Sequence, residues 1–146
     1  IISTNIVKIK NIIYSIDNIE KAVDRIHIES KEKLLCFYGN LGAGKTTLIK
    51  ELLKRLGATD TGSSPTFGLV NEYRDYQGKL LAYHLDCYRI EEPEEALDFG
   101  IEEYLEADCW VFVEWPEHIE ALLPEDRTDI HIEAFAEDRR RLTIKT

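Results

Sequence analysis

A glycine-rich stretch near the middle of the first half of the chain has the residue types and spacing of a phosphate-binding loop. It fits the pattern G-x-x-x-x-G-K-[ST], in which backbone N–H groups surround phosphate, the lysine reaches the β- and γ-phosphates and the final hydroxyl binds Mg²⁺. An apolar run at 34–38 precedes it and a helical pattern over 47–56 follows, which argues against a chance match in a turn. We expect the following residues to bind a nucleoside triphosphate: Gly39, Asn40, Leu41, Gly42, Ala43, Gly44, Lys45, Thr46 and Thr47.

Two acidic residues follow apolar runs of strand length and are candidates for the metal and the reaction. Glu114 follows Cys109–Val113, which is the Walker B pattern, and Asp86 follows Leu80–Leu85. If both strands neighbour the strand before the loop, both carboxylates reach the Mg²⁺ that Thr46 would bind. We expect one to hold the metal and the other to orient or deprotonate the attacking water, and the sequence leaves open which is the base. The alternative for each is a solvated carboxylate at a strand end.

Four further side chains have a possible role near the nucleotide. Thr66 lies in a turn-rich loop, where a hydroxyl would sense Mg²⁺ and the γ-phosphate, or simply form a turn. His84 alternates with Asp86 along a strand and would orient it, contact a partner or pack in the core. Trp115 is more typical of core packing than of base stacking, and Arg89 fits a phosphate or partner contact as well as a surface ion pair. The catalytic candidates are Lys45, Asp86, Glu114 and Thr66.

The periodicity of apolar residues alternates between strands and helices along the chain. A helix is expected from Asp17, as N-cap with Glu20 as capping-box partner, to about Ile28, and Gly57 would end the helix after the loop. This order predicts a three-layer α/β sandwich on a mostly parallel sheet, with a C-terminal antiparallel hairpin. Strands are expected at 6–13, 34–38, 69–73, 79–85, 109–113, 129–135 and 139–145, and further helices at 93–104 and 116–122.

Composition is that of a globular protein, with 44% hydrophobic and 32% charged residues over 146 positions. We expect a single domain over residues 1–146. The net charge of −10 disfavours direct binding of a nucleic-acid backbone, and the basic cluster Arg139–Arg141 is typical of a solvated strand start.

No apolar stretch approaches the roughly 20 residues that span a bilayer, and no signal-peptide pattern is present. The separated Cys36, Cys87 and Cys109 favour free thiols, so we expect a cytoplasmic protein without a membrane association.

Together these motifs resemble the TsaE family, the bacterial P-loop ATPases of tRNA threonylcarbamoyladenosine (t6A) biosynthesis. The resemblance extends over nearly the whole chain and rests on the phosphate loop, Ser64-Pro65-Thr66-Phe67, His84-Leu85-Asp86-Cys87-Tyr88-Arg89 and Val113-Glu114-Trp115-Pro116 in this order. Asn40 stands where the family commonly has Asp, which leaves the backbone cradle unaffected.

The resemblance implies an activity and partners that spacing alone does not. Members bind ATP with Mg²⁺, hydrolyse it slowly and support the TsaB–TsaD pair, which modifies adenosine 37 of tRNA. By this analogy TsaB and TsaD homologues are the partners, tRNA is involved only indirectly, and Thr46, Asp86 and Glu114 surround the metal. Ser15, just before the first expected helix, would lie near the nucleotide.

Three other functions also fit a phosphate loop. A small-molecule kinase would need an arginine-bearing lid, for which only Arg139–Arg141 is available. A GTP-driven switch is disfavoured because the N-K-x-D motif is missing and Asp86-Cys87-Tyr88-Arg89 lacks the glycine of D-x-x-G. A nucleotide-gated binding module with little turnover remains open.

Overall fold

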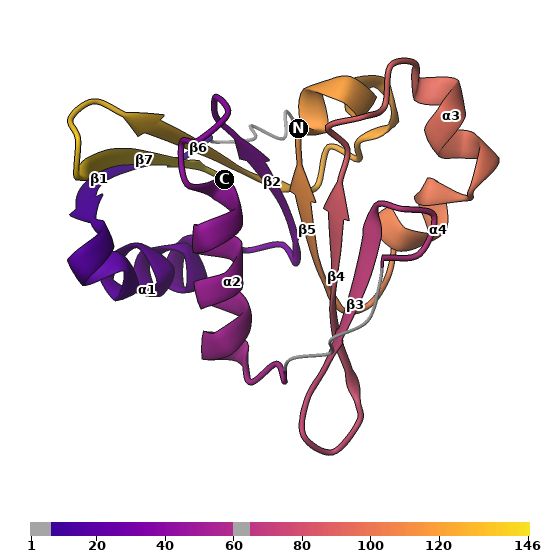
Figure 1. The fold of residues 1–146 in the computed structure, drawn as a ribbon, viewed down its shortest axis with the longest axis horizontal. Coiled ribbons are helices and arrows are strands. Elements are labelled where there is room, and N and C mark those ends of the chain that lie inside the picture. The colour runs from indigo at the N-terminus through magenta and orange to yellow at the C-terminus, as the bar shows by residue number, and fades with distance from the viewer. Residues whose placement is uncertain (1–6, 60–64) are drawn as a thin grey trace, which may run out of the picture.

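The computed structural model describes residues 7–59 and 65–146, which form one seven-stranded sheet with helices on both faces (Figure 1). The spatial order β1-β7-β6-β2-β5-β4-β3 places β2, the strand before the phosphate loop, at the centre. The strands are β1 (Ile9–Ser15), β2 (Leu34–Tyr38), β3 (Val70–Arg74), β4 (Leu80–Asp86), β5 (Trp110–Glu114), β6 (Thr128–Ala134) and β7 (Arg139–Lys145). The helices are α1 (Ile19–Glu29), α2 (Lys45–Leu56), α3 (Pro93–Asp98) and α4 (Ile101–Leu105), with 3-10 helices η1 (Ile16–Asn18) and η2 (Pro116–Leu122).

Strand direction divides the sheet into a parallel centre and antiparallel edges. β6, β2, β5 and β4 are parallel to one another, whereas β7 and β1 on one side and β3 on the other pair antiparallel. The predicted α/β sandwich with a parallel central sheet and a C-terminal hairpin is therefore confirmed. The carboxyl ends of β2, β5 and β4 meet at one edge, which is where open α/β sheets bind ligands.

Two hydrophobic cores, one on each face of the sheet, explain why β2 is apolar at every position. Leu35 and Phe37 pack with α1 and α2 on one face, and Leu34 and Cys36 pack with α3, α4 and η2 on the other. Figure 1 shows these two helical layers on opposite sides of the strands. Burial raises the pKa of the Cys36 thiol, and all three cysteines are free, as the sequence predicts.

The N-terminal elements differ from the sequence prediction. The strand expected at 6–13 is β1, Ile9–Ser15, and Ile6 lies outside the described residues. Asp17 is not the helix N-cap, because it lies within η1 and α1 begins only after Asn18. The Asn18 side chain accepts a hydrogen bond from the Ser15 backbone N–H at 2.6 Å, and this short-range bond closes the turn that precedes α1.

One expected helix is corrected, and the condition set for the two strands that carry the predicted acids is met by one of them. The helix expected over 93–104 is two helices, because Gly100 adopts a left-handed conformation (φ 76°) that an α-helix cannot continue through. β4 pairs with β5 and not with β2, so of the two strands that end in a predicted acid, only β5, which ends in Glu114, neighbours the phosphate-loop strand. Within the described residues, no helix is long and apolar enough to cross a membrane.

Candidate functional site

The loop between β2 and α2 has the conformation that its glycines permit. A Cβ atom at Gly39 would lie 2.8 Å from the Ile132 carbonyl oxygen of β6, so only glycine fits this close approach. Gly44 has φ 107° and forms the N-cap of α2, a left-handed position that a side chain would strain. The loop therefore delivers the N-terminus of α2, with its unpaired N–H groups, to the carboxyl edge of the sheet.

Two contacts hold the side-chain ammonium group of Lys45 against the loop backbone and the Trp115 ring. Its Nζ donates a hydrogen bond to the Gly39 carbonyl oxygen at 2.5 Å and lies 3.3 Å from the centroid of the Trp115 ring. Burial lowers the pKa of Lys45, and the carboxylates of Glu114, Glu117 and Asp86 oppose this shift. The indole reaches the ammonium because Trp115 adopts a left-handed backbone conformation (φ 56°) directly after β5.

A chain of hydrogen bonds connects α2, β5 and β4 beneath the loop. The Thr46 hydroxyl donates to Glu114 Oε1 at 2.7 Å, and the other oxygen, Oε2, lies 2.6 Å from His84 Nε2. Glu114 is only 3% exposed. Burial acts to raise the pKa of Glu114, but the hydrogen bonds from His84 and Thr46 and the charges of His84 and Lys45 outweigh it and hold that pKa below the usual value. His84 thus orients Glu114, and not Asp86 as its alternation along β4 suggested.

Asp86 is the more accessible of the two predicted acids. It ends β4 opposite Glu114 in the strand register, and its Oδ1 accepts a hydrogen bond from the Tyr88 backbone N–H at 3.1 Å. An open pocket of about 300 Å³ brings together the acids, the helix start and two aromatic rings. Its lining is Leu41, Gly42, Gly44, Lys45, Thr46, Thr47, Asp86, Tyr88, Glu114 and Trp115.

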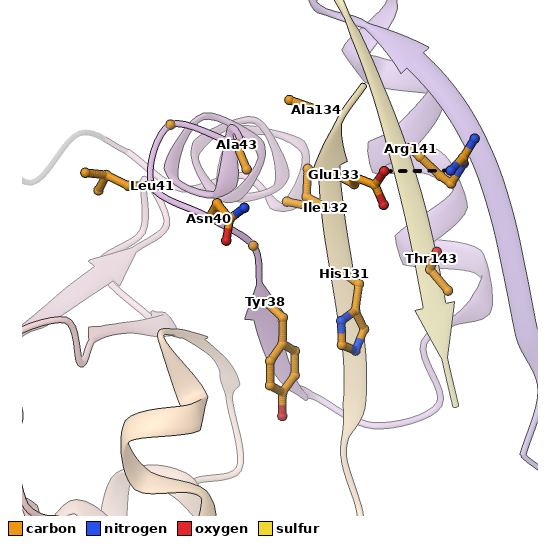
Figure 2. A pocket seen from close by; sticks show the side chains of 12 residues that line it. Tyr38, Asn40, Leu41, Ala43, His131, Ile132, Glu133, Ala134, Arg141 and Thr143 are labelled. Carbon is orange, nitrogen blue, oxygen red and sulfur yellow. Dashed lines mark ion pairs between the residues drawn. The ribbon is translucent and has the colours of Figure 1, made fainter. Parts of the chain in front are cut away.

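A second hollow of about 470 Å³ lies against the opposite side of the loop and the outer surface of β6 and β7 (Figure 2). The Tyr38 and His131 rings stack in it with centroids 4.5 Å apart, and Glu133 pairs with Arg141 at 3.9 Å. Burial and the Lys145 charge lower the pKa of His131. Gly39, Asn40, Leu41, Gly42 and Ala43 line this hollow, and Leu41 and Gly42 also line the pocket beside Glu114, so the loop borders both.

In the described part of the chain, three predicted residues belong neither to these two hollows nor to the hydrogen-bond chain that includes His84. Thr66 is exposed and joins its turn to β3 through its backbone, while Ser64 of the same motif lies outside the described residues. Ser15 ends β1, and its hydroxyl lies 3.1 Å from Asn18 Oδ1. Arg89 is exposed. The roles proposed for these residues stay predictions.

Arg140 contacts the phosphate loop, although the sequence pattern at 139–141 was interpreted as a solvated basic cluster. Its Nε donates to the Ala43 carbonyl oxygen at 2.9 Å. The neighbours Arg139 and Arg141 are exposed as expected. The alternation of faces along a strand could have indicated this contact. Arg140 lies on the same face of β7 as the buried Leu142, whereas Arg139 and Arg141 lie on the other face.

The fold and the site are those of a P-loop-like α/β protein, and known proteins of similar sequence and structure define the family. Residues 13–142 match the family model "Threonylcarbamoyl adenosine biosynthesis protein TsaE". This chain belongs to the TsaE family. The TsaE protein of Bacillus subtilis is 42% identical over 111 residues, covering 76% of this chain and 68% of that protein. The TsaE protein of Haemophilus influenzae is 37% identical over 120 residues, covering 82% and 73%. The crystal structure of Bacillus subtilis YdiB matches with a TM-score of 0.75 at 29% identity, covering 98% of this chain and 88% of that one.

The ionised Glu114 predicts a specific pH dependence of stability. An unfolded glutamate titrates near 4.5, and the folded Glu114 titrates lower, so its stabilisation is complete above that value and is lost as the pH falls through the folded pKa. We expect Glu114→Gln to lower the free energy of unfolding at neutral pH by about 1–3 kcal/mol. We also expect the difference from wild type to shrink below about pH 4.5.

Urea unfolding of both proteins across this pH range measures the effect. The matched control is Glu117→Gln, which removes an exposed carboxylate three positions away. Parallel stability curves for wild type and Glu114→Gln would show that Glu114 is not ionised against its partners.

Proposed function

We propose that this chain binds ATP with Mg²⁺, hydrolyses it slowly and thereby supports t6A formation by TsaB and TsaD homologues in the cytoplasm. One observation carries the proposal: the hydrogen-bond chain from Thr46 through Glu114 to His84 lies directly beside the N-terminus of α2. A phosphate loop with an oriented, ionised carboxylate at the end of the neighbouring strand is what triphosphate hydrolysis requires.

The triphosphate would bind where α2 begins. The first N–H groups of α2 have no partners within the helix, and the helix dipole favours an anion there. Lys45 would exchange the Gly39 carbonyl and the Trp115 ring for phosphate oxygens, which are stronger partners for an ammonium group. The contacts that Lys45 makes in this structure therefore hold it close to the position from which it would act.

The residues beside the loop fit a magnesium ion. No group of three His, Cys, Asp or Glu side chains in the described residues is arranged to hold a metal by itself. The Thr46 hydroxyl and the Glu114 carboxylate are within 2.7 Å of each other and Asp86 lines the same pocket, so three hard oxygen donors converge there. Thr46 and Glu114 would hold Mg²⁺ together with phosphate oxygens, with Asp86 within reach of the ion or of a water bound to it, and the ion would neutralise charge that develops on those oxygens.

The two acids differ enough to receive different roles. Glu114 already accepts two hydrogen bonds and its pKa is lowered, which makes it a weak proton acceptor and a good fixed anion. Asp86 is exposed at the mouth of the same pocket and has an oxygen that no hydrogen bond in the described part of the chain occupies. We assign Glu114 to the metal and Asp86 to orienting the attacking water.

Slow turnover follows from the charge of the pocket. Among the described lining residues, Lys45 is the only side-chain cation. An additional arginine, in the same chain or from a partner, accelerates such reactions by roughly 10³–10⁵-fold. Its absence from this lining supports a slow intrinsic ATPase that a partner completes.

Surface properties of the chain support a protein partner and only indirect contact with tRNA. Leu41 is 76% exposed in the loop and Phe67 is 60% exposed on the turn that precedes β3. No Lys or Arg occurs between Arg89 and Arg127, the segment that contains α3, α4 and η2 and is rich in Asp and Glu. The negative charge of this segment would repel the phosphate backbone of a nucleic acid.

Substitutions in the pocket should separate ATP binding from hydrolysis. We expect Lys45→Ala to abolish measurable ATP binding, since it removes the lining's only side-chain cation. We expect Asp86→Ala and Glu114→Ala to lower Mg²⁺-dependent hydrolysis by roughly 100-fold or more while ATP still binds without Mg²⁺. Calorimetric titration and phosphate release measure the two quantities, with the exposed Lys50→Ala of α2 as the control.

Two results would count against the assignment. Unchanged ATP affinity in Lys45→Ala would remove the phosphate site from this loop. Normal turnover in both acid variants, with intact binding, would leave a nucleotide-gated binding module as the better function.

Capture of TsaB and TsaD homologues from the same organism tests the partner. We expect the tagged chain to retain them in a manner that depends on ATP, and we expect Phe67→Ala to weaken capture. Tyr76→Ala is the matched control, because Tyr76 is 84% exposed at the β3–β4 turn, away from the pocket. Failure to capture either homologue in any nucleotide state would disprove the partnership.

A further inference from the structure

Arg140 reaches the phosphate loop from the opposite end of the chain. It lies on β7, opposite Tyr14 of β1 and Ala134 of β6, and its Nε donates to the Ala43 carbonyl oxygen at 2.9 Å. Its Nη1 donates to the backbone carbonyl oxygens of Arg139 at 3.1 Å and Ala136 at 3.4 Å. The guanidinium therefore connects the β6–β7 turn with the start of α2, and its position is fixed from both sides.

The geometry of one peptide group determines what this bond does. The Ala43 carbonyl and the Gly44 N–H belong to the same planar trans peptide, so they point in opposite directions. Because the carbonyl points to Arg140, the Gly44 N–H points away from it. Gly44 is the N-cap of α2 and lines the pocket that also contains Lys45 and Thr46. Its N–H has no partner within the helix and is a donor for phosphate.

This peptide needs an external restraint. Gly44 has φ 107°, but glycine populates positive and negative φ about equally, so rotation of the Ala43–Gly44 peptide costs little at this position. Rotation would turn a carbonyl oxygen toward the phosphates in place of an N–H. The hydrogen bond from Arg140 is lost in the rotated form, so Arg140 favours the orientation that binds an anion.

The charge of Arg140 supports the same role. A Cβ at Gly44 would lie 3.8 Å from Arg140 Nε, which places the guanidinium beside the N-terminus of α2. A cation is unfavourable at the positive end of a helix, and Lys45 lies close by as well. When an anion binds at this helix N-terminus, both cations interact with it favourably.

We propose that Arg140 is a positioning residue of the phosphate site, which holds the Gly44 N–H toward the polyphosphate of the nucleotide and adds positive charge behind the loop. This inference rests on the proposed binding of ATP at the loop. It extends the site to β7, and it predicts that Arg140 acts on the polyphosphate part of the ligand, whatever base is attached.

The test compares two arginines that differ by one position and carry the same charge. Arg140→Gln removes the bond to Ala43, whereas Arg139→Gln removes an exposed guanidinium and changes the net charge equally. Titrations with inorganic tripolyphosphate and with ATP measure affinity, and urea unfolding measures stability. We expect Arg140→Gln to weaken both ligands by the same factor, roughly 10-fold or more, and Arg140→Lys to recover part of the loss. Arg139→Gln should bind both like wild type.

A spectroscopic readout separates positioning from general destabilisation. In ¹H–¹⁵N spectra of the unliganded proteins, the Gly44 amide signal should shift or broaden in Arg140→Gln and remain in place in Arg139→Gln. Equal affinities and equal Gly44 signals in the two variants would overturn the role of Arg140. If wild type binds neither ligand, or Lys45→Ala binds as tightly as wild type, the proposed ATP site itself fails. Loss of binding in Lys45→Ala with no difference between the two arginine variants would overturn only the present inference.

Discussion

The buried carboxylate of Glu114 is the constraint on which the site depends. A carboxylate that is only 3% exposed is costly unless both oxygens have partners, and here Thr46 and His84 supply them. These partners come from the start of α2, which follows β2 through the phosphate loop, and from β4, and β2 and β4 are the two strands that flank β5. The start of the helix, the Walker B strand and the strand carrying Asp86 are therefore tied together before any ligand is bound.

The phosphate loop is restrained on its other side by close packing and by one cation. Gly39 passes so near the Ile132 carbonyl of β6 that no Cβ fits, and Arg140 of β7 holds the Ala43 carbonyl. The loop thus lies between an acidic cluster at β4–β5 and a basic contact at β6–β7. If ATP binds as proposed, this arrangement would place the metal on the β4–β5 side of the loop and a further positive charge on the β6–β7 side, and the C-terminal hairpin would contribute to the nucleotide site as well as to the sheet.

Local patterns predicted much of this arrangement. The phosphate loop, its flanking strand and helix, and Glu114 at the end of an apolar strand are all encoded in short stretches, and the structure contains each of them. Contacts between distant segments were not predictable in the same way. The alternation along β4 placed His84 beside Asp86, but the pairing of β4 with β5 directs His84 to Glu114.

The remaining errors have local physical causes. Asp17 has the residue type of a helix N-cap. The hydrogen bond between the Ser15 backbone and the Asn18 side chain closes a turn over these residues, so α1 begins only at Ile19. The helical pattern over 93–104 is interrupted because Gly100 takes a left-handed conformation, which glycine adopts without the steric cost that a side chain would add. The contact of Arg140 was not predicted because a run of three arginines is typical of solvent exposure. Only the alternation of faces along the strand distinguishes Arg140 from Arg139 and Arg141.

The most direct measurement of the central claim, that Lys45 leaves an internal resting position to bind the phosphates of ATP, is tryptophan fluorescence. The chain has two tryptophans, so a Trp110→Phe variant reports on Trp115 alone, and Lys45 Nζ lies 3.3 Å from the centroid of that ring. Titration with ATP and Mg²⁺ should change the Trp115 emission saturably, and the same titration in a Trp110→Phe/Lys45→Ala double variant should leave it unchanged. An emission that stays constant while ATP binds, or an identical change without Lys45, would contradict this role of the lysine.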